Sequence, residues 1–124
     1  MKVFDFQRVG NAFFYSMKGL KKAFQNETAC QQELIMLFVL TPVACFMGVS
    51  LVEKILLIAS LLLVLIVEIL NTAIEAIVDM VSPEPHPLAE YAKDLGSAAV
   101  FLSLLLGVLV WGGIVGYNYF IVKG

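Results

Sequence analysis

Long runs of apolar residues without a single charge are the feature that most constrains this sequence. Residues 55–67 and residues 95–122 contain no charged side chain, and a shorter uncharged run spans residues 34–48. A helix of about 20 apolar residues crosses the hydrocarbon of a bilayer, so runs of this kind predict membrane spans. The hydrophobic content of 60%, against roughly 45–50% in soluble globular chains, supports the same conclusion.

We therefore predict an all-α membrane protein that forms a single membrane domain over residues 1–124. The three spans are expected over about residues 28–48, 51–81 and 88–122. Residues 82–87 separate the last two, because their three prolines remove backbone donors and favour extended conformations. Ahead of the spans, residues 3–25 place apolar side chains on one helical face and cations on the other, which predicts an amphipathic helix on the membrane surface.

Basic residues are distributed unevenly between the two sides of the predicted spans. Those before the first span or at the start of the third are Lys2, Arg8, Lys18, Lys21, Lys22 and Lys93. Only Lys54 and Lys123 fall on the opposite side. Since cytoplasmic segments carry the excess of Lys and Arg, we predict a cytoplasmic N-terminus, a cytoplasmic proline loop and a periplasmic C-terminus.

Ionisable residues interrupt the second span in a regular pattern. Glu68 follows the apolar residues 55–67, and Asn71, Thr72, Glu75 and Asp79 then recur at helical spacings. These spacings put all five side chains on one stripe, about 16 Å long. A carboxylate within a span costs at least about 2.5 kcal/mol, so a row of three acids indicates a function. A helix end that leaves the membrane would explain Asp79, but not Glu68.

Further polar residues are expected at the same cytoplasmic level. Glu27 precedes the first span, and Lys93, Asp94 and Ser97 lie early in the third. Carboxylate oxygens suit Mg²⁺, which takes one or two of them and completes its shell with water and phosphate. A deep carboxylate suits proton abstraction, and lysine complements phosphate. The pattern therefore fits phosphoryl transfer from a soluble nucleotide to a lipid hydroxyl, without the GxxxxGK[ST] loop of soluble enzymes.

The acidic stripe also resembles a known signature. The segment Glu68-Ile-Leu-Asn-Thr-Ala-Ile-Glu75-Ala-Ile-Val-Asp79 is similar to the signature of the prokaryotic diacylglycerol kinase family and meets all its fixed positions. The resemblance continues in Asn26-Glu27, Gln32-Glu33, His86 and Ala92-Lys93-Asp94-Leu95-Gly96-Ser97. It implies a homotrimer in the bacterial inner membrane, with active sites shared between subunits.

The resemblance implies a role for individual residues in phosphorylating 1,2-diacylglycerol with magnesium ATP, which recycles this lipid to phosphatidate. Glu68 would be the general base, Asn71 and Lys93 would complete the catalytic set, and Asp79 would support it. Glu27 and Glu75 would hold Mg²⁺. The nucleotide would contact Arg8, Tyr15, Glu27, Glu75, Glu84, His86, Lys93 and Asp94. The lipid would contact Arg8, Ser16, Met17, Glu33, Glu68, Ser97 and Trp111.

Alternative functions are also compatible with parts of the pattern. An undecaprenol kinase, from a Gram-positive branch of the same family, would use the same chemistry on a long polyprenol. A non-enzymatic proton or cation pathway would also contain intramembrane carboxylates. Such a pathway needs polar groups across the midplane, and residues 55–67 and 98–110 offer almost none. A structural subunit would have no need for Glu68 and Glu75 on one face.

Overall fold

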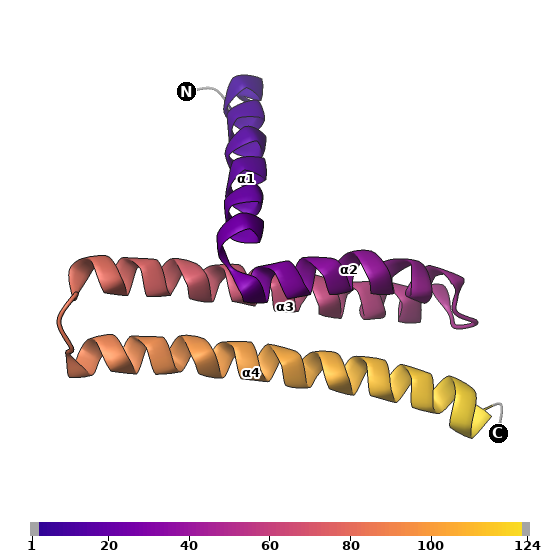
Figure 1. The fold of residues 1–124 in the computed structure, drawn as a ribbon. Coiled ribbons are helices and arrows are strands. Elements are labelled where there is room, and N and C mark those ends of the chain that lie inside the picture. The colour runs from indigo at the N-terminus through magenta and orange to yellow at the C-terminus, as the bar shows by residue number, and fades with distance from the viewer. Residues whose placement is uncertain (1–2, 123–124) are drawn as a thin grey trace.

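The computed structural model describes residues 3–122, and these residues form helices joined by short connections (Figure 1). Helix α1 spans Phe6–Asn26, α2 spans Thr28–Phe46, α3 spans Leu51–Val81 and α4 spans Pro87–Gly116. A π-helix over Tyr117–Val122 continues α4. Lys2 and Lys123, which entered the charge distribution, lie outside the described residues. The all-α prediction is confirmed, and three helices are long and apolar enough to cross a membrane.

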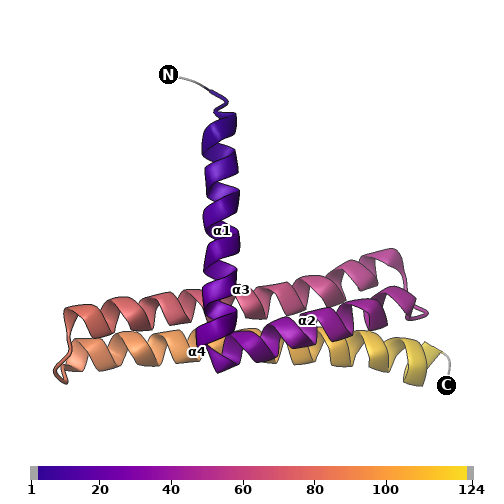
Figure 2. The ribbon, with the colours of Figure 1, turned by 45° about the horizontal axis from the view of Figure 1, so that its top comes forward.

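The three spans run side by side, whereas α1 projects away from them at a steep angle (Figure 1 and Figure 2). Helix α3 packs against both α2 and α4. Helices α3 and α4 also continue well past the level at which α1 joins α2, as both views show. With α1 in the membrane surface, as the sequence predicts, this extension of α3 and α4 would reach into the headgroup layer.

Local capping explains where the helices begin. Helix α1 starts at Phe6 rather than near residue 3, because the side chain of Asp5 accepts a hydrogen bond from the Arg8 backbone at 3.2 Å. Ser50 and Glu53 form a capping box at the start of α3. Helix α4 starts at Pro87 rather than Leu88, since proline suits the first helical position. Helix α2 ends at Phe46 rather than residue 48, because the backbone of the next residue, Met47, is extended.

Few side chains are buried within a single chain. The buried apolar side chains lie mainly on α3 and α2, and they are Cys30, Ala44, Leu57, Leu61, Val64 and Leu65. Helix α1 has no buried residue, and its Phe6 is 84% exposed. Exposed apolar surface of this extent is rare on soluble monomers. Lipid and other membrane helices are the natural cover for it.

Candidate active site

The acidic stripe of α3 runs from the interior of the bundle to its surface. Glu68 is only 9% exposed. Asn71, Thr72 and Glu75 are half-buried, and the side chain of Asp79 is 65% exposed. Exposure is therefore lowest at Glu68 and highest at Asp79, with the other three residues between them.

The start of α2 closes the buried end of this stripe. Cys30 is fully buried, and its thiol lies beside the side chain of Thr72. The carboxylates of Glu27, Glu33 and Glu68 all lie close enough to the thiol to interact with it electrostatically. Cys30 and Cys45 are both free. The buried thiol thus lies within electrostatic range of acids from two helices and one connection.

Glu27 forms the whole connection between α1 and α2. Its backbone is extended, its N–H donates to the Ala23 carbonyl at 2.9 Å, and its carbonyl accepts from the Gln31 N–H at 3.0 Å. These bonds satisfy the ends of both helices with backbone groups. The carboxylate makes no capping hydrogen bond, so it is available to a ligand.

Helix α4 supplies a cation at the exposed end. Lys93 Nζ lies 2.6 Å from Asp79 Oδ1, and the two side chains are 45% and 65% exposed. Both residues line a polar pocket of about 380 Å³, which Glu84, His86 and Asp94 also line. Exposed ion pairs contribute little to stability. Lys93 can therefore exchange Asp79 for a phosphate group at little cost.

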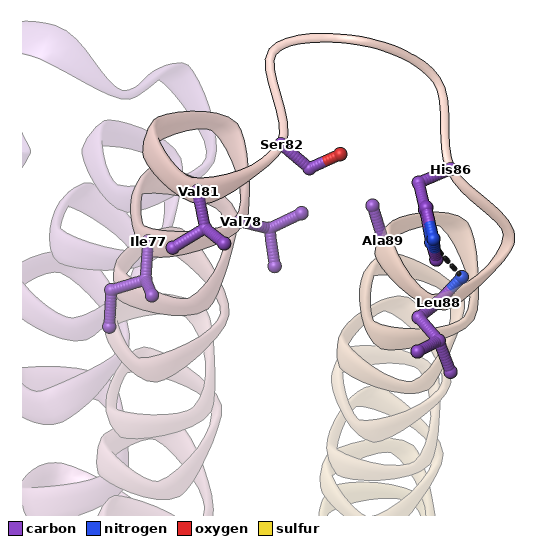
Figure 3. A pocket seen from close by; sticks show the side chains of 7 residues that line it. All are labelled: Ile77, Val78, Val81, Ser82, His86, Leu88 and Ala89. Carbon is purple, nitrogen blue, oxygen red and sulfur yellow. Dashed lines mark hydrogen bonds between the residues drawn. The ribbon is translucent and has the colours of Figure 1, made fainter.

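An apolar pocket of about 430 Å³ adjoins the polar one, between the end of α3 and the start of α4 (Figure 3). Ile77, Val78, Val81, Ser82, His86, Leu88 and Ala89 line it. His86 Nδ1 accepts a hydrogen bond from the Leu88 backbone at 3.1 Å, so the imidazole caps α4. Ser82, His86 and Ala89 line both pockets. The two pockets together form a continuous site, with apolar side chains on one side and charged side chains on the other.

Asn71 connects the middle of the stripe to Glu75. Its Nδ2 donates to Glu75 Oε1 at 3.2 Å. Its Oδ1 is buried, and no hydrogen-bond donor reaches it among residues 3–122. A buried polar atom without a partner costs free energy, which makes this amide a point of functional interest.

Comparison with known proteins identifies the family. The sequence profile described as "Prokaryotic diacylglycerol kinase" matches residues 14–115, a segment that contains the stripe, both pockets and most of α4. The chain belongs to the prokaryotic diacylglycerol kinase family. Similar proteins include the diacylglycerol kinase of Haemophilus influenzae, 47% identical over 104 residues that cover 84% of this chain and 88% of that one.

Two further relatives of the family match to a similar extent. The diacylglycerol kinase of Pseudomonas aeruginosa is 49% identical over 108 residues, which cover 87% of this chain and 88% of the relative. That of Escherichia coli K12 is 45% identical over 106 residues, covering 86% and 87%. Three apolar spans together with membership of the prokaryotic diacylglycerol kinase family support an inner-membrane protein.

The arrangement of carboxylates fits one kind of metal site. Residues 3–122 contain no group of three or more His, Cys, Asp or Glu that could hold a metal ion by itself. Mg²⁺ typically takes only one or two protein carboxylates and fills its remaining positions with water and phosphate oxygens. With Oε1 of Glu75 engaged by Asn71, its second oxygen suits such a shared ligand shell. The residues therefore fit Mg²⁺ that arrives with a nucleotide.

Several predicted site residues of this diacylglycerol kinase family member lie apart from Glu68 within one chain. Arg8, Tyr15, Ser16 and Met17 are exposed on α1, which leads away from the bundle (Figure 1). Trp111 donates from Nε1 to the Leu57 carbonyl at 3.2 Å, towards the opposite end of α3. Among the predicted lipid contacts, Glu33 lies close enough to Glu68 to interact with it electrostatically.

Two residues near the cluster had no predicted role. Cys30 lies three positions from both Glu27 and Glu33, so helical spacing alone places it on their face. Gly96 is buried on α4 against Asn71. Its place in the segment that resembles the family is the sequence signal that could have found it. Several other glycines lie on α4, and the sequence does not show which of them faces Asn71.

Proposed function

We propose that this chain transfers the γ-phosphoryl group of ATP to the hydroxyl of 1,2-diacylglycerol, which gives phosphatidate and ADP. The observation that carries the proposal is the series from buried Glu68 to the exposed pair of Asp79 and Lys93. A lipid hydroxyl can approach the buried end, and a soluble nucleotide can approach the exposed end. Membership of the family supports the same reaction.

Glu68 is the proposed general base. Its carboxylate takes the proton from the lipid hydroxyl while the oxygen attacks the γ-phosphorus. The bond between the γ-phosphorus and the β–γ bridging oxygen then breaks, ADP leaves, and Glu68 later releases the proton to water. Most of the catalysis of such transfers comes from positioning and charge stabilisation, which the remaining residues supply.

The nucleotide is placed across the two adjoining pockets. Its phosphates lie beside Lys93, which leaves Asp79 to bind them, with Asp94 nearby. Glu84 and His86 contact the nucleoside, whose base packs in the apolar pocket. Glu27 and Glu75 hold Mg²⁺, which when bound neutralises charge on the phosphate oxygens. Asn71 keeps Glu75 oriented through the hydrogen bond described above.

An apolar groove is the proposed place for one acyl chain. A pocket of about 280 Å³ is lined by Glu33, Met36, Leu40, Ser60, Leu61, Val64, Leu104, Gly107, Val108 and Trp111. Its polar end at Glu33 lies near Glu68, and Ser97 borders the headgroup side. Because Trp111 lines this groove, it remains a predicted contact of the lipid. The contact would be to the acyl chain, far from the reacting hydroxyl.

A homotrimer with shared sites accounts for the residues on α1. Within one chain, α1 projects away from the bundle and buries none of its residues (Figure 2). In a trimer, its Arg8 and Tyr15 would reach the nucleotide, and Ser16 and Met17 the lipid, of a neighbouring site. The proposed orientation places α1 and the proline loop in the cytoplasm, which is where ATP is found.

The alternatives find less support. The relatives that match are diacylglycerol kinases, so a polyprenol acceptor is not favoured. A cation pathway would need exposed polar groups along the spans. The hydroxyls of Ser60 and Ser103 instead donate to carbonyls of their own helices, each at 2.7 Å.

Purified protein in mixed micelles, supplied with magnesium ATP and either diacylglycerol or undecaprenol, tests the proposal directly. We expect phosphatidate to be the preferred product, formed with one ADP for each lipid. The Glu68→Gln variant serves as the blank for contaminating kinases. Faster phosphorylation of undecaprenol, or ADP release without any lipid product, would overturn the proposal.

A further inference from the structure

One glycine of α4 differs from the others in what surrounds it. A Cβ built on Gly96 would collide with Asn71 Oδ1, and its next two neighbours are Asn71 Cγ at 3.2 Å and Asn71 Cβ at 3.9 Å. All three nearest atoms therefore belong to a single side chain on the facing helix. On Gly112, Gly113 and Gly116 of α4, a Cβ would meet nothing within 4 Å.

The side chain that occupies this space is held at both ends. Asn71 Oδ1 lies against Gly96, buried and without a hydrogen-bond donor in the described part of the chain. At the other end of the amide, Nδ2 donates to Glu75 Oε1 at 3.2 Å. Reversing the amide would turn Oδ1 towards a carboxylate oxygen and lose this bond. The space at Gly96 therefore fixes where the Asn71 amide lies, and the Glu75 carboxylate selects Nδ2 as the atom that faces it.

We infer that Gly96 is a positioning residue for the phosphoryl transfer, because its missing Cβ creates the space that directs the Asn71 amide at Glu75. With Oε1 held by Asn71, the rotation of the Glu75 carboxylate is restricted and Oε2 points to a fixed place. Groups that orient a metal-binding carboxylate affect metal affinity although they never touch the metal. This inference rests on the proposed role of Glu75 as a ligand of Mg²⁺.

The Gly96→Ala variant tests the inference, with Gly112→Ala as the matched control. Both changes add one methyl group to α4 and raise its helix propensity equally, but only the first meets Asn71. We expect Gly96→Ala to raise the Mg²⁺ concentration for half-maximal activity by about ten-fold or more, as Glu75→Gln should. The KM for diacylglycerol should stay within about two-fold in both glycine variants. Equal behaviour of the two glycine variants, or a KM change as large as the Mg²⁺ change, would overturn the inference.

A second measurement is independent of activity. Unfolding of the four proteins in a cycle of Gly96→Ala and Asn71→Ala separates the contact from any general effect of the methyl group. Gly96→Ala should destabilise the protein that contains Asn71 and have little effect once Asn71 is alanine. Additive effects would overturn the inference. The expected non-additive cycle, found together with no kinase activity in the unsubstituted protein, would instead refute the proposed function and retain the Gly96–Asn71 contact.

Discussion

The two ends of α3 treat polar side chains in opposite ways. At the end near its N-terminus, Glu53 completes a capping box with Ser50 and accepts from Asn118 Nδ2 at 2.8 Å. Nearby, the Tyr119 hydroxyl accepts from the Gly48 backbone at 3.0 Å. At the other end, Glu68 and Glu75 interact as like charges, and Asn71 Oδ1 is buried without a donor among residues 3–122. Both ends are rich in polar groups, but the second leaves one buried amide oxygen without a donor and brings like charges together.

This difference indicates which end is built for stability and which for chemistry. The hydrogen bonds near Glu53 join the α2–α3 connection and the start of α3 to the π-helix that continues α4, and Figure 1 shows these segments at the same end of the bundle. The carboxylates near Glu68 repel one another, and in the proposed function a bound cation would relieve this repulsion. Unfavourable arrangements of this kind persist where function requires them. Matched substitutions at the two ends can therefore separate activity from stability.

The largest expected effect is the loss of turnover in Glu68→Gln. Without a carboxylate to take the hydroxyl proton, kcat should fall by about 100-fold or more. Glu53→Gln makes the same change on the same helix at the opposite end, and it should keep kcat within about two-fold. Phosphatidate formation under saturating ATP and lipid gives both values. Turnover by Glu68→Gln close to that of Glu53→Gln would remove Glu68 from the base role.

Lys93→Met is expected to weaken the use of ATP by about ten-fold or more in kcat/KM, because phosphate loses its cationic partner. Asp79→Asn breaks the same ion pair but keeps the lysine, so its effect should be much smaller. Initial rates over a range of ATP concentrations distinguish the two. Similar losses in both variants would mean that the ion pair itself, rather than Lys93 alone, is required.

The variants Glu53→Gln and Glu68→Gln are expected to rank in the reverse order when stability, rather than kcat, is measured. Glu53→Gln removes the charge of the carboxylate that accepts hydrogen bonds from Asn118 Nδ2 and from the Ser50 N–H, so its unfolding midpoint should fall. Glu68→Gln relieves the repulsion with Glu33 and Glu75, so its midpoint should stay or rise. Denaturant unfolding followed by circular dichroism measures both. A lower midpoint in Glu68→Gln than in Glu53→Gln would contradict the contrast between the two ends.

Trp111 gives the smallest expected effect. Trp111→Phe keeps an aromatic ring but removes the donor to the Leu57 carbonyl, which should cost about 1 kcal/mol of stability. The KM for diacylglycerol should not change, since the ring still lines the groove. Trp111→Ala removes that wall, so it should raise the KM. An unchanged KM in Trp111→Ala would exclude the predicted lipid contact.

Much of this organisation could be read from the sequence, because it depends on local periodicity. Uncharged runs indicated the three spans, the prolines at residues 82–87 indicated the break before α4, and the spacing from Glu68 to Asp79 indicated one stripe. The first residues of α1 and α4 were predicted less closely, because capping by Asp5 and His86 depends on side-chain geometry. The hydrogen bond by which Trp111 joins α4 to α3 was also missed, because the resemblance implied only a lipid contact for this residue.

The sequence by itself thus determined which residues share a helical face and where each lies along the axis of its helix. The tertiary structure decided which faces meet: Cys30 beside Thr72, Lys93 beside Asp79, and Gly96 against Asn71. The physical reason is that the 3.6-residue repeat is a property of each helix alone. The rotation and axial register between helices come from packing, and a change in either would bring a different residue opposite Asn71.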